Sequence, residues 1–124
     1  MTIALVFPGQ GSQAVGMGTA LAAAFPVARE TFEEVDEALK QNLFKLMSEG
    51  PEDALVLTEN AQPAIGTISM GYFNFLKSLE INPDAVAGHS YGEFTALHAS
   101  GVLSANDLFT ISEKRGSIMA NGCE

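Results

Sequence analysis

The pentapeptide Gly88-His89-Ser90-Tyr91-Gly92 has the form G-x-S-x-G, which is typical of a sharp turn from a strand into a helix. The apolar run Ala85-Val86-Ala87 precedes the turn and predicts a short strand, and Glu93–Ser100 follows it and predicts a helix. A serine on such a turn projects its hydroxyl away from the backbone, at the positive end of the following helix. The turn therefore makes Ser90 a candidate nucleophile on an α/β fold.

Three neighbours of Ser90 fit the same chemistry. Gly88 and Gly92 are the small residues that a close approach of strand and helix requires. The backbone N–H of Tyr91 can point at the oxyanion that forms when Ser90 attacks a carbonyl group. A serine in an ordinary turn is the alternative hypothesis. It is less favoured, because a predicted strand and a predicted helix flank the motif.

A serine nucleophile also needs a general base, and the chain has two histidines. His89 precedes Ser90, so its side chain should leave the turn in another direction, and we expect it to pack under the turn. His98 follows Ser90 by eight residues, which is about 12 Å along a helix at a rise of 1.5 Å per residue. We expect it on a helix face. The base therefore lies outside this chain, or Ser90 does no chemistry.

The rest of the chain predicts one more strand and a series of helices. Ile3–Phe7 is an apolar run that ends at Pro8-Gly9 and predicts a buried parallel strand. Leu55–Leu57 gives no clear prediction. The order of elements predicts an α/β fold with a parallel sheet, and so few strands indicate a piece of a larger domain. Helices are predicted over Gly16–Phe25, Pro26–Leu39, Asn42–Met47, Asn60–Leu79 and, after the N-cap Ser104, Ala105–Met119.

Composition excludes several classes of function. Hydrophobic residues make up 47% of the 124 positions, which is enough for one folded core. A net charge of −9 with only six basic residues argues against nucleic acid or an anionic membrane as a partner. The single cysteine, Cys123, excludes a disulfide framework and a cysteine metal site within one chain. The sequence shows neither a signal peptide nor a membrane span, so we expect a soluble cytoplasmic protein.

The chain contains four notable sequence blocks: Phe7-Pro8-Gly9-Gln10-Gly11-Ser12-Gln13, Glu59-Asn60-Ala61-Gln62-Pro63-Ala64, Gly88-His89-Ser90-Tyr91-Gly92-Glu93 and Arg115-Gly116. These blocks resemble those of malonyl-CoA:acyl-carrier-protein transacylases and of the acyltransferase domains of polyketide and fatty acid synthases. The resemblance implies an α/β-hydrolase-like parallel sheet, with residues 1–124 as the N-terminal part of the large α/β subdomain. The catalytic histidine, a small ferredoxin-like subdomain and the remaining strands would lie outside these residues.

The resemblance also implies a role for each site residue. Ser90 would take a malonyl group from coenzyme A and pass it to the phosphopantetheine thiol of acyl carrier protein. Gln10 and the Tyr91 N–H would stabilise the oxyanion. Arg115 would hold the free carboxylate of the malonyl group, since its planar fork suits that anion, and Gln62 would line the same pocket. Coenzyme A thioester is then a substrate, so no cofactor and no metal are expected.

Other interpretations of these residues remain open at this point. Without the resemblance, Arg115 would be a solvated cation on the last helix, and Gln10 and Gln62 would form loop and helix-cap hydrogen bonds. Relatives commonly have Leu or Gln where this chain has Tyr91, so its side chain is expected to narrow or reshape the pocket. A serine esterase or lipase would explain the turn but neither Gln10 nor Arg115. An inactive fragment that only binds a partner would explain the missing base.

Overall fold

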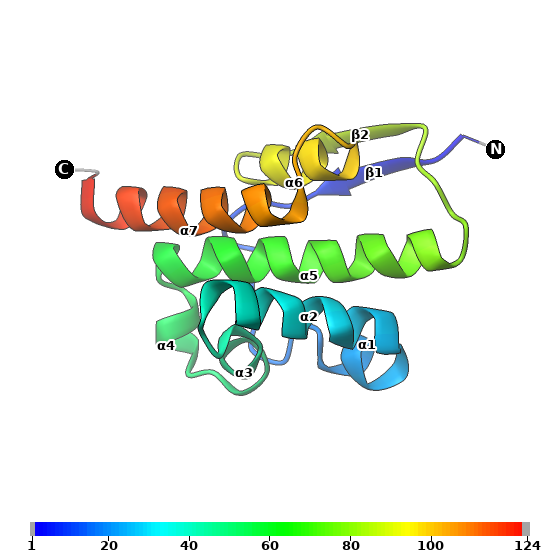
Figure 1. Ribbon diagram of the computed structural model, residues 1–124. Coiled ribbons are helices and arrows are strands. Elements are labelled where there is room, and N and C mark those ends of the chain that lie inside the picture. The colour runs from blue at the N-terminus through cyan, green and yellow to red at the C-terminus, as the bar shows by residue number, and fades with distance from the viewer. Residues whose placement is uncertain (1, 123–124) are drawn as a thin grey trace.

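The structure is a computed structural model that describes residues 2–122. Two short strands, β1 (Ala4–Phe7) and β2 (Ala85–Gly88), lie on one side of a layer of helices (Figure 1). They pair in parallel, with Ala4 opposite Ala85 and Phe7 opposite Gly88. The predicted α/β class with a parallel sheet is therefore confirmed. The helices are α1 (Thr19–Ala24), α2 (Pro26–Leu39), α3 (Leu43–Glu49), α4 (Glu52–Leu55), α5 (Thr58–Ser78), α6 (Gly92–Ala99) and α7 (Ala105–Gly122).

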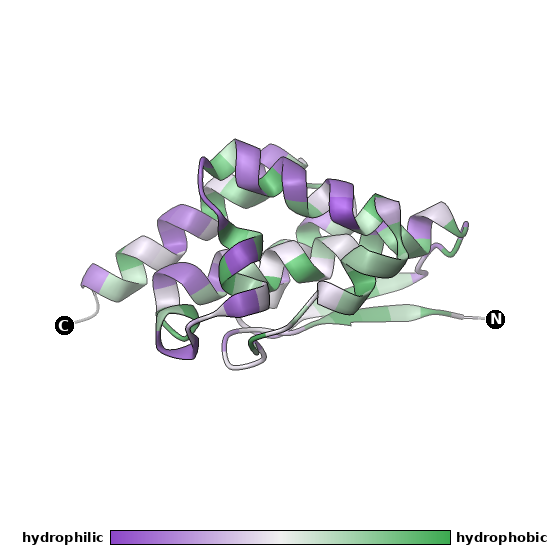
Figure 2. Cartoon of the chain, turned by 90° about the horizontal axis from the view of Figure 1, so that it is seen from below, coloured by the Kyte–Doolittle hydropathy of each residue, from purple (hydrophilic) through white to green (hydrophobic). Residues whose placement is uncertain are grey.

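The strands are less buried than the sequence predicts. Phe7 is buried, but Val6 is 73% exposed. A strand is buried on both faces only when other elements cover both, and within residues 2–122 β1 packs mainly against β2 and α6. The hydrophobic strand β1 accordingly lies at the margin of the molecule (Figure 2).

Helix α5 is the central helix of the layer. It lies between α7 on one side and α2 on the other, and both of these run antiparallel to it (Figure 1). Its buried face includes Ile65, Met70 and Phe73, but Leu79 is 55% exposed. Small residues share that face and allow close packing: a β-carbon at Gly71 would lie 2.6 Å from the Phe32 ring.

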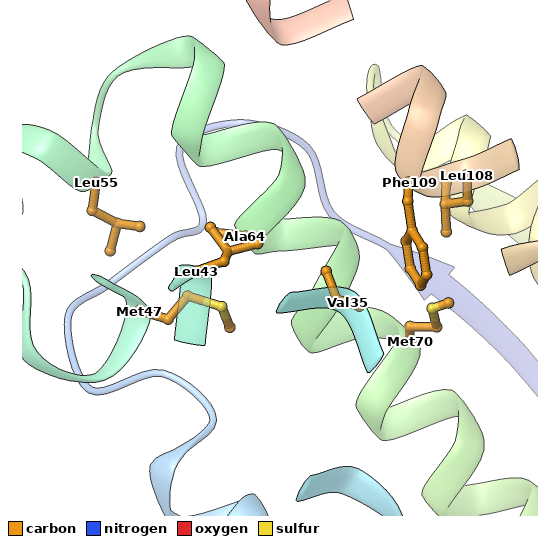
Figure 3. Close-up of a cluster of buried hydrophobic side chains, with 8 residues drawn as sticks. All are labelled: Val35, Leu43, Met47, Leu55, Ala64, Met70, Leu108 and Phe109. Carbon is orange, nitrogen blue, oxygen red and sulfur yellow. The ribbon is translucent and has the colours of Figure 1, made fainter. Parts of the chain in front are cut away.

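The main hydrophobic core joins the helices on both sides of α5 (Figure 3). Each of α2, α3, α4, α5 and α7 contributes to it, so it also fixes the position of α7 relative to α5. The buried face of α2 includes Phe32 and Val35, each 1% exposed. The core consists of Val35, Leu43, Met47, Leu55, Ala64, Met70, Leu108 and Phe109.

Helix ends differ from the prediction where the backbone has a special conformation. The helix expected from Gly16 begins only at Thr19, because Gly16 and Gly18 have φ values of 96° and 83°. Helix α3 begins where the Asp36 carboxylate accepts hydrogen bonds from the N–H groups of Leu43 and Phe44, at 2.9 and 3.1 Å. Both boundaries depend on geometry that local sequence patterns do not carry.

Candidate active site

Ser90 occupies the turn between β2 and α6, as predicted. Its φ of 55° is left-handed, a conformation that favours glycine. A serine in this conformation is strained by about 1–2 kcal/mol, and such strain is often found at functional sites. Ser90 is exposed, so the described residues do not enclose its hydroxyl group.

The glycines around Ser90 are required by close packing. A β-carbon at Gly88 would overlap the backbone of Gly92, and one at Gly92 would overlap the carbonyl oxygen of Phe7. At Gly9, in the loop after β1, a β-carbon would lie 2.6 Å from the His89 carbonyl oxygen. The predicted need for small residues beside Ser90 is therefore confirmed, and the loop after β1 lies directly against the turn.

Backbone hydrogen bonds among the described residues fix the turn but leave the Tyr91 amide free. The His89 N–H donates to the Phe7 carbonyl oxygen at 3.1 Å, and the N–H groups of Gly92 and Glu93 donate to the carbonyl oxygens of His89 and Ser90 at 2.9 and 3.1 Å. Within residues 2–122 the Tyr91 N–H has no hydrogen-bond partner. It remains available to donate to an oxyanion formed next to Ser90.

Gln10 connects the loop after β1 to the start of α5. It is exposed, and its side-chain amide donates to the Thr58 hydroxyl at 2.9 Å. Because Gly9 lies against the turn, Gln10 is one residue away from a direct neighbour of Ser90. The structure thus brings the Gln10 loop to Ser90, while the Gln10 side chain itself is held by Thr58.

Arg115 and Gln62 are brought together by the antiparallel packing of α5 and α7. The Arg115 Nη1 donates to Gln62 Oε1 at 2.9 Å, and the guanidinium carbon lies 5.4 Å from the centre of the Phe94 ring. Gln62 is fully buried, and its amide nitrogen also contacts the Met119 sulfur at 3.2 Å. Arg115 is therefore not a freely solvated helix cation, because groups from α5 and α6 fix its guanidinium.

The guanidinium retains capacity for an anionic ligand. Gln62 is its one side-chain hydrogen-bond acceptor within residues 2–122, and in that part of the chain no carboxylate forms an ion pair with Arg115. An arginine has five N–H donors arranged in a planar fork. The structure thus shows a half-buried, oriented arginine whose charge is not neutralised by the described residues.

The Tyr91 side chain corrects one expectation. It is fully buried and turns away from Ser90 into the space between α5 and α7, where its hydroxyl is hydrogen-bonded to Ser112. Burial raises the pKa of Tyr91 to about 12, and the positive charge of Arg115 opposes this effect. A fully buried ring cannot itself narrow an accessible pocket.

Neither histidine is hydrogen-bonded to Ser90 within residues 2–122. His89 is exposed and does not pack under the turn as predicted, because the described residues leave that side of the turn uncovered. His98 lies on a helix face as expected, where its Nδ1 is hydrogen-bonded to the Leu103 carbonyl oxygen at 2.9 Å and its ring contacts Phe73 edge-on. Among the described residues, neither histidine therefore forms a hydrogen bond with Ser90.

Sequence reasoning missed the residues that hold the predicted ones in place. Thr58 holds Gln10, Phe94 and Met119 flank the Arg115–Gln62 pair, and Ser112 holds Tyr91. These are contacts between segments far apart in the sequence, so local patterns could not reveal them. None of the helices in the described part of the chain is long and apolar enough to cross a membrane.

Comparison with known protein families identifies the class of protein to which this chain belongs. The model of the acyl transferase domain family matches residues 4–121. The chain therefore belongs to the acyl transferase domain family, as the resemblance of its sequence blocks predicted.

Individual relatives are more specific. The malonyl CoA-acyl carrier protein transacylase of Bacillus subtilis (strain 168) is 47% identical over 117 residues, which are 94% of this chain and 37% of that protein. The crystal structure of an acyl-carrier-protein-S-malonyltransferase from Bartonella henselae matches with a TM-score of 0.93 and 45% identity, over 98% of this chain and 40% of that one.

A third relative was solved with a partner. It is a malonyl-transacylase in complex with its type II PKS acyl-carrier protein, and it matches with a TM-score of 0.91 and 39% identity, over 96% of this chain and 39% of that one. The chain thus spans between 37% and 40% of the length of these relatives.

Proposed function

We propose that this chain supplies the nucleophile and the carboxylate-binding residues of a malonyl-CoA:acyl-carrier-protein transacylase. Residues 1–124 would form the N-terminal part of its large α/β subdomain, and the reaction would serve fatty acid or polyketide biosynthesis. The observation that carries the proposal is the oriented Arg115, held by Gln62 and Phe94 with no carboxylate partner among residues 2–122. Family membership and the names of the relatives support it.

The proposed reaction has two acyl transfers. Ser90 Oγ attacks the thioester carbonyl of malonyl-CoA, its proton passes to a general base, and the coenzyme A thiolate leaves with that proton. The phosphopantetheine thiol of acyl carrier protein then attacks the Ser90 ester in the same way and regenerates the hydroxyl group. The free Tyr91 N–H, together with Gln10 on the adjoining loop, would stabilise the oxyanion in both steps.

Arg115 is the reason why we propose a malonyl group, and not an acetyl group, as the acyl group that is transferred. Malonyl-CoA carries a carboxylate that acetyl-CoA lacks, and bringing this charge into a half-buried site is unfavourable unless a cation meets it. The guanidinium is already oriented by Gln62, so little side-chain freedom would be lost when the carboxylate binds. The general base is the part that the described residues do not supply. By the family resemblance it is a histidine outside residues 1–124.

Acylation of the full-length native polypeptide tests this function. The protein is incubated with labelled malonyl-CoA, and the modified residue is located by peptide mass spectrometry; we expect the label on Ser90 and its transfer to acyl carrier protein. Ser90→Ala should abolish labelling. Ser78→Ala, which removes an exposed hydroxyl at the end of α5, should not. Release of free malonate without transfer would favour the esterase hypothesis, and an unlabelled protein would exclude both enzymes.

A further inference from the structure

Three elements meet at the phenol group of Tyr91. The residue begins the α6 segment directly after Ser90, and its ring is fully buried. On the α5 side it lies against Gly66, where a β-carbon would overlap the phenol oxygen. On the α7 side its hydroxyl is hydrogen-bonded to Ser112. The absence of a side chain at Gly66 thus creates the space that the phenol fills.

The direction of this hydrogen bond follows from proton counting. The Ser112 hydroxyl has one proton, and it donates that proton to the Leu108 carbonyl oxygen at 2.7 Å. The Tyr91 hydroxyl must then be the donor to Ser112 Oγ. This donation satisfies a phenol that is buried away from water, where an unpaired hydroxyl would be costly.

The contacts of the phenol lie one helical turn from the Arg115–Gln62 pair. On α5, Gly66 follows Gln62 by four residues, and on α7, Ser112 precedes Arg115 by three residues. Residues three or four apart lie on the same face of a helix. The Tyr91 phenol therefore contacts the same two helix faces that carry the pair, immediately next to it.

We propose that Tyr91 is a positioning residue that fixes the distance between Ser90 and the Arg115 guanidinium and so selects acyl groups by the length between thioester and carboxylate. The inference rests on the proposed function. The backbone of Tyr91 belongs to the turn beside Ser90, and the Tyr91 phenol is held by the helices that carry Gln62 and Arg115. A malonyl group has one carbon between its two carbonyl groups, and a succinyl group has two. A fixed distance suits one of them, and a small misplacement costs much of the rate.

A purely structural role for Tyr91 makes a different prediction. If the phenol only stabilises the fold, its loss lowers the amount of folded protein and reduces the activity toward every substrate by the same factor. If it sets a distance, its loss changes the ratio between substrates. The substrate ratio is therefore the measurement that separates the two roles.

The test uses the full-length native polypeptide and its variants Tyr91→Phe, Ser112→Ala and the double variant. We measure kcat/KM for malonyl-, succinyl- and acetyl-CoA together with the unfolding temperature. We expect Tyr91→Phe to lower malonyl transfer relative to both other substrates roughly threefold to tenfold, as for the loss of one oriented hydrogen bond. Tyr72→Phe alters the other tyrosine, which is 52% exposed, and should leave every ratio unchanged.

The double variant separates stability from positioning. Ser112→Ala removes the observed acceptor of the buried phenol and should lower the unfolding temperature, whereas removing both hydroxyls should recover most of it. We expect the recovered double variant to keep the altered substrate ratio. If malonyl-CoA acylates the native protein at Ser90 but the variants keep the native ratio of kcat/KM values between substrates, the positioning role is overturned and the proposed function stands. A native protein that malonyl-CoA does not acylate would overturn the proposed function and this inference together.

Discussion

The Ser90 backbone is held in a conformation that its own side chain disfavours. Its φ of 55° persists because contacts on either side leave the turn no alternative: the Gly92 and Glu93 amides are bonded back to His89 and Ser90, and Gly88 packs on Gly92. Relaxing Ser90 would break these contacts together. The turn thus keeps the hydroxyl exposed and the Tyr91 amide free at the same position.

Arg115 provides the most direct prediction for a single residue. On the proposed function, replacing it by alanine removes the charge-assisted hydrogen-bonding group that binds the carboxylate of the substrate. In the full-length polypeptide, Arg115→Ala should lower kcat/KM for malonyl-CoA relative to acetyl-CoA roughly a hundredfold. Arg115→Lys should recover this ratio only in part, because an ammonium group cannot reproduce the planar fork.

The matched control for this prediction is the neighbouring cation. Lys114 is exposed on the same helix, so Lys114→Ala should leave the malonyl-to-acetyl ratio at the native value. Equal ratios in the native, alanine and lysine proteins would show that Arg115 does not bind the carboxylate, and the proposal of malonyl transfer would lose its main structural support.

Tyr91 gives a prediction about pH. Burial raises its pKa to about 12 in the folded protein from an ordinary value of 10.0, so the folded state favours the neutral phenol. As the pH rises, the unfolded chain loses the Tyr91 proton first. Stability is therefore complete below about pH 10 and is lost as the pH approaches about 12, by about 2–3 kcal/mol in total.

Urea unfolding from about pH 9 to about pH 11 measures this effect. The free energy of unfolding should fall less steeply with pH in Tyr91→Phe than in the native protein, and Tyr72→Phe should behave like the native protein. A native pH dependence in Tyr91→Phe would show that the phenol does not contribute to alkaline unfolding.

At the scale of elements, the approach of α7 to α5 depends on Gly116. A β-carbon there would lie 2.9 Å from the Thr58 carbonyl oxygen and 3.1 Å from the Glu59 α-carbon, so α7 would have to move. Gly→Ala in a helix is ordinarily stabilising by about 1 kcal/mol. Here the clash with backbone atoms should reverse the sign, since backbone cannot give way as a flexible side chain can.

Gly116→Ala is therefore expected to destabilise the protein by about 1–3 kcal/mol and to reduce malonyl transfer, because the shift displaces the adjacent Arg115. Gly122 lies in the same helix, and the nearest atom to a β-carbon there is 3.8 Å away, so Gly122→Ala is the control and should be close to neutral. Thermal unfolding and the malonyl-to-acetyl ratio measure the two effects. An equally stable Gly116→Ala protein with a native ratio would contradict this account of the helix contact.

The elements that the sequence predicted well are those with a local signal. Helix α2 was predicted with its observed bounds, because Pro26 suits the first helical position. The start of α1 was wrong because two glycines adopt positive φ values before it. The burial of β1 was also wrong, because burial depends on what covers a strand and not on its own composition.

At the scale of the whole molecule, the site is assembled from distant segments. Arg115 and Gln62 are 53 positions apart in the sequence, and Gln10 and Thr58 are 48 apart. The resemblance to known sequence blocks indicated which residues belong to the site, but it carried no geometry. The contacts of Phe94, Met119 and Ser112 follow only from how α5, α6 and α7 pack, so they could not be predicted from any local pattern.

The last prediction concerns what these residues can do alone. Within residues 2–122 Ser90 forms no hydrogen bond with either histidine, and His98 is already bound to Leu103. Residues 1–124 purified alone should therefore transfer malonyl groups roughly four to six orders of magnitude more slowly than a complete enzyme, as after loss of the base in a serine site.

A hybrid in which residues 4–121 replace the matching segment of the Bacillus subtilis relative should regain transfer, and the same hybrid with Ser90→Ala should not. The measurement is malonyl transfer to acyl carrier protein, with the mass of each protein verified. Full turnover by residues 1–124 alone would mean that a base other than an external histidine activates Ser90.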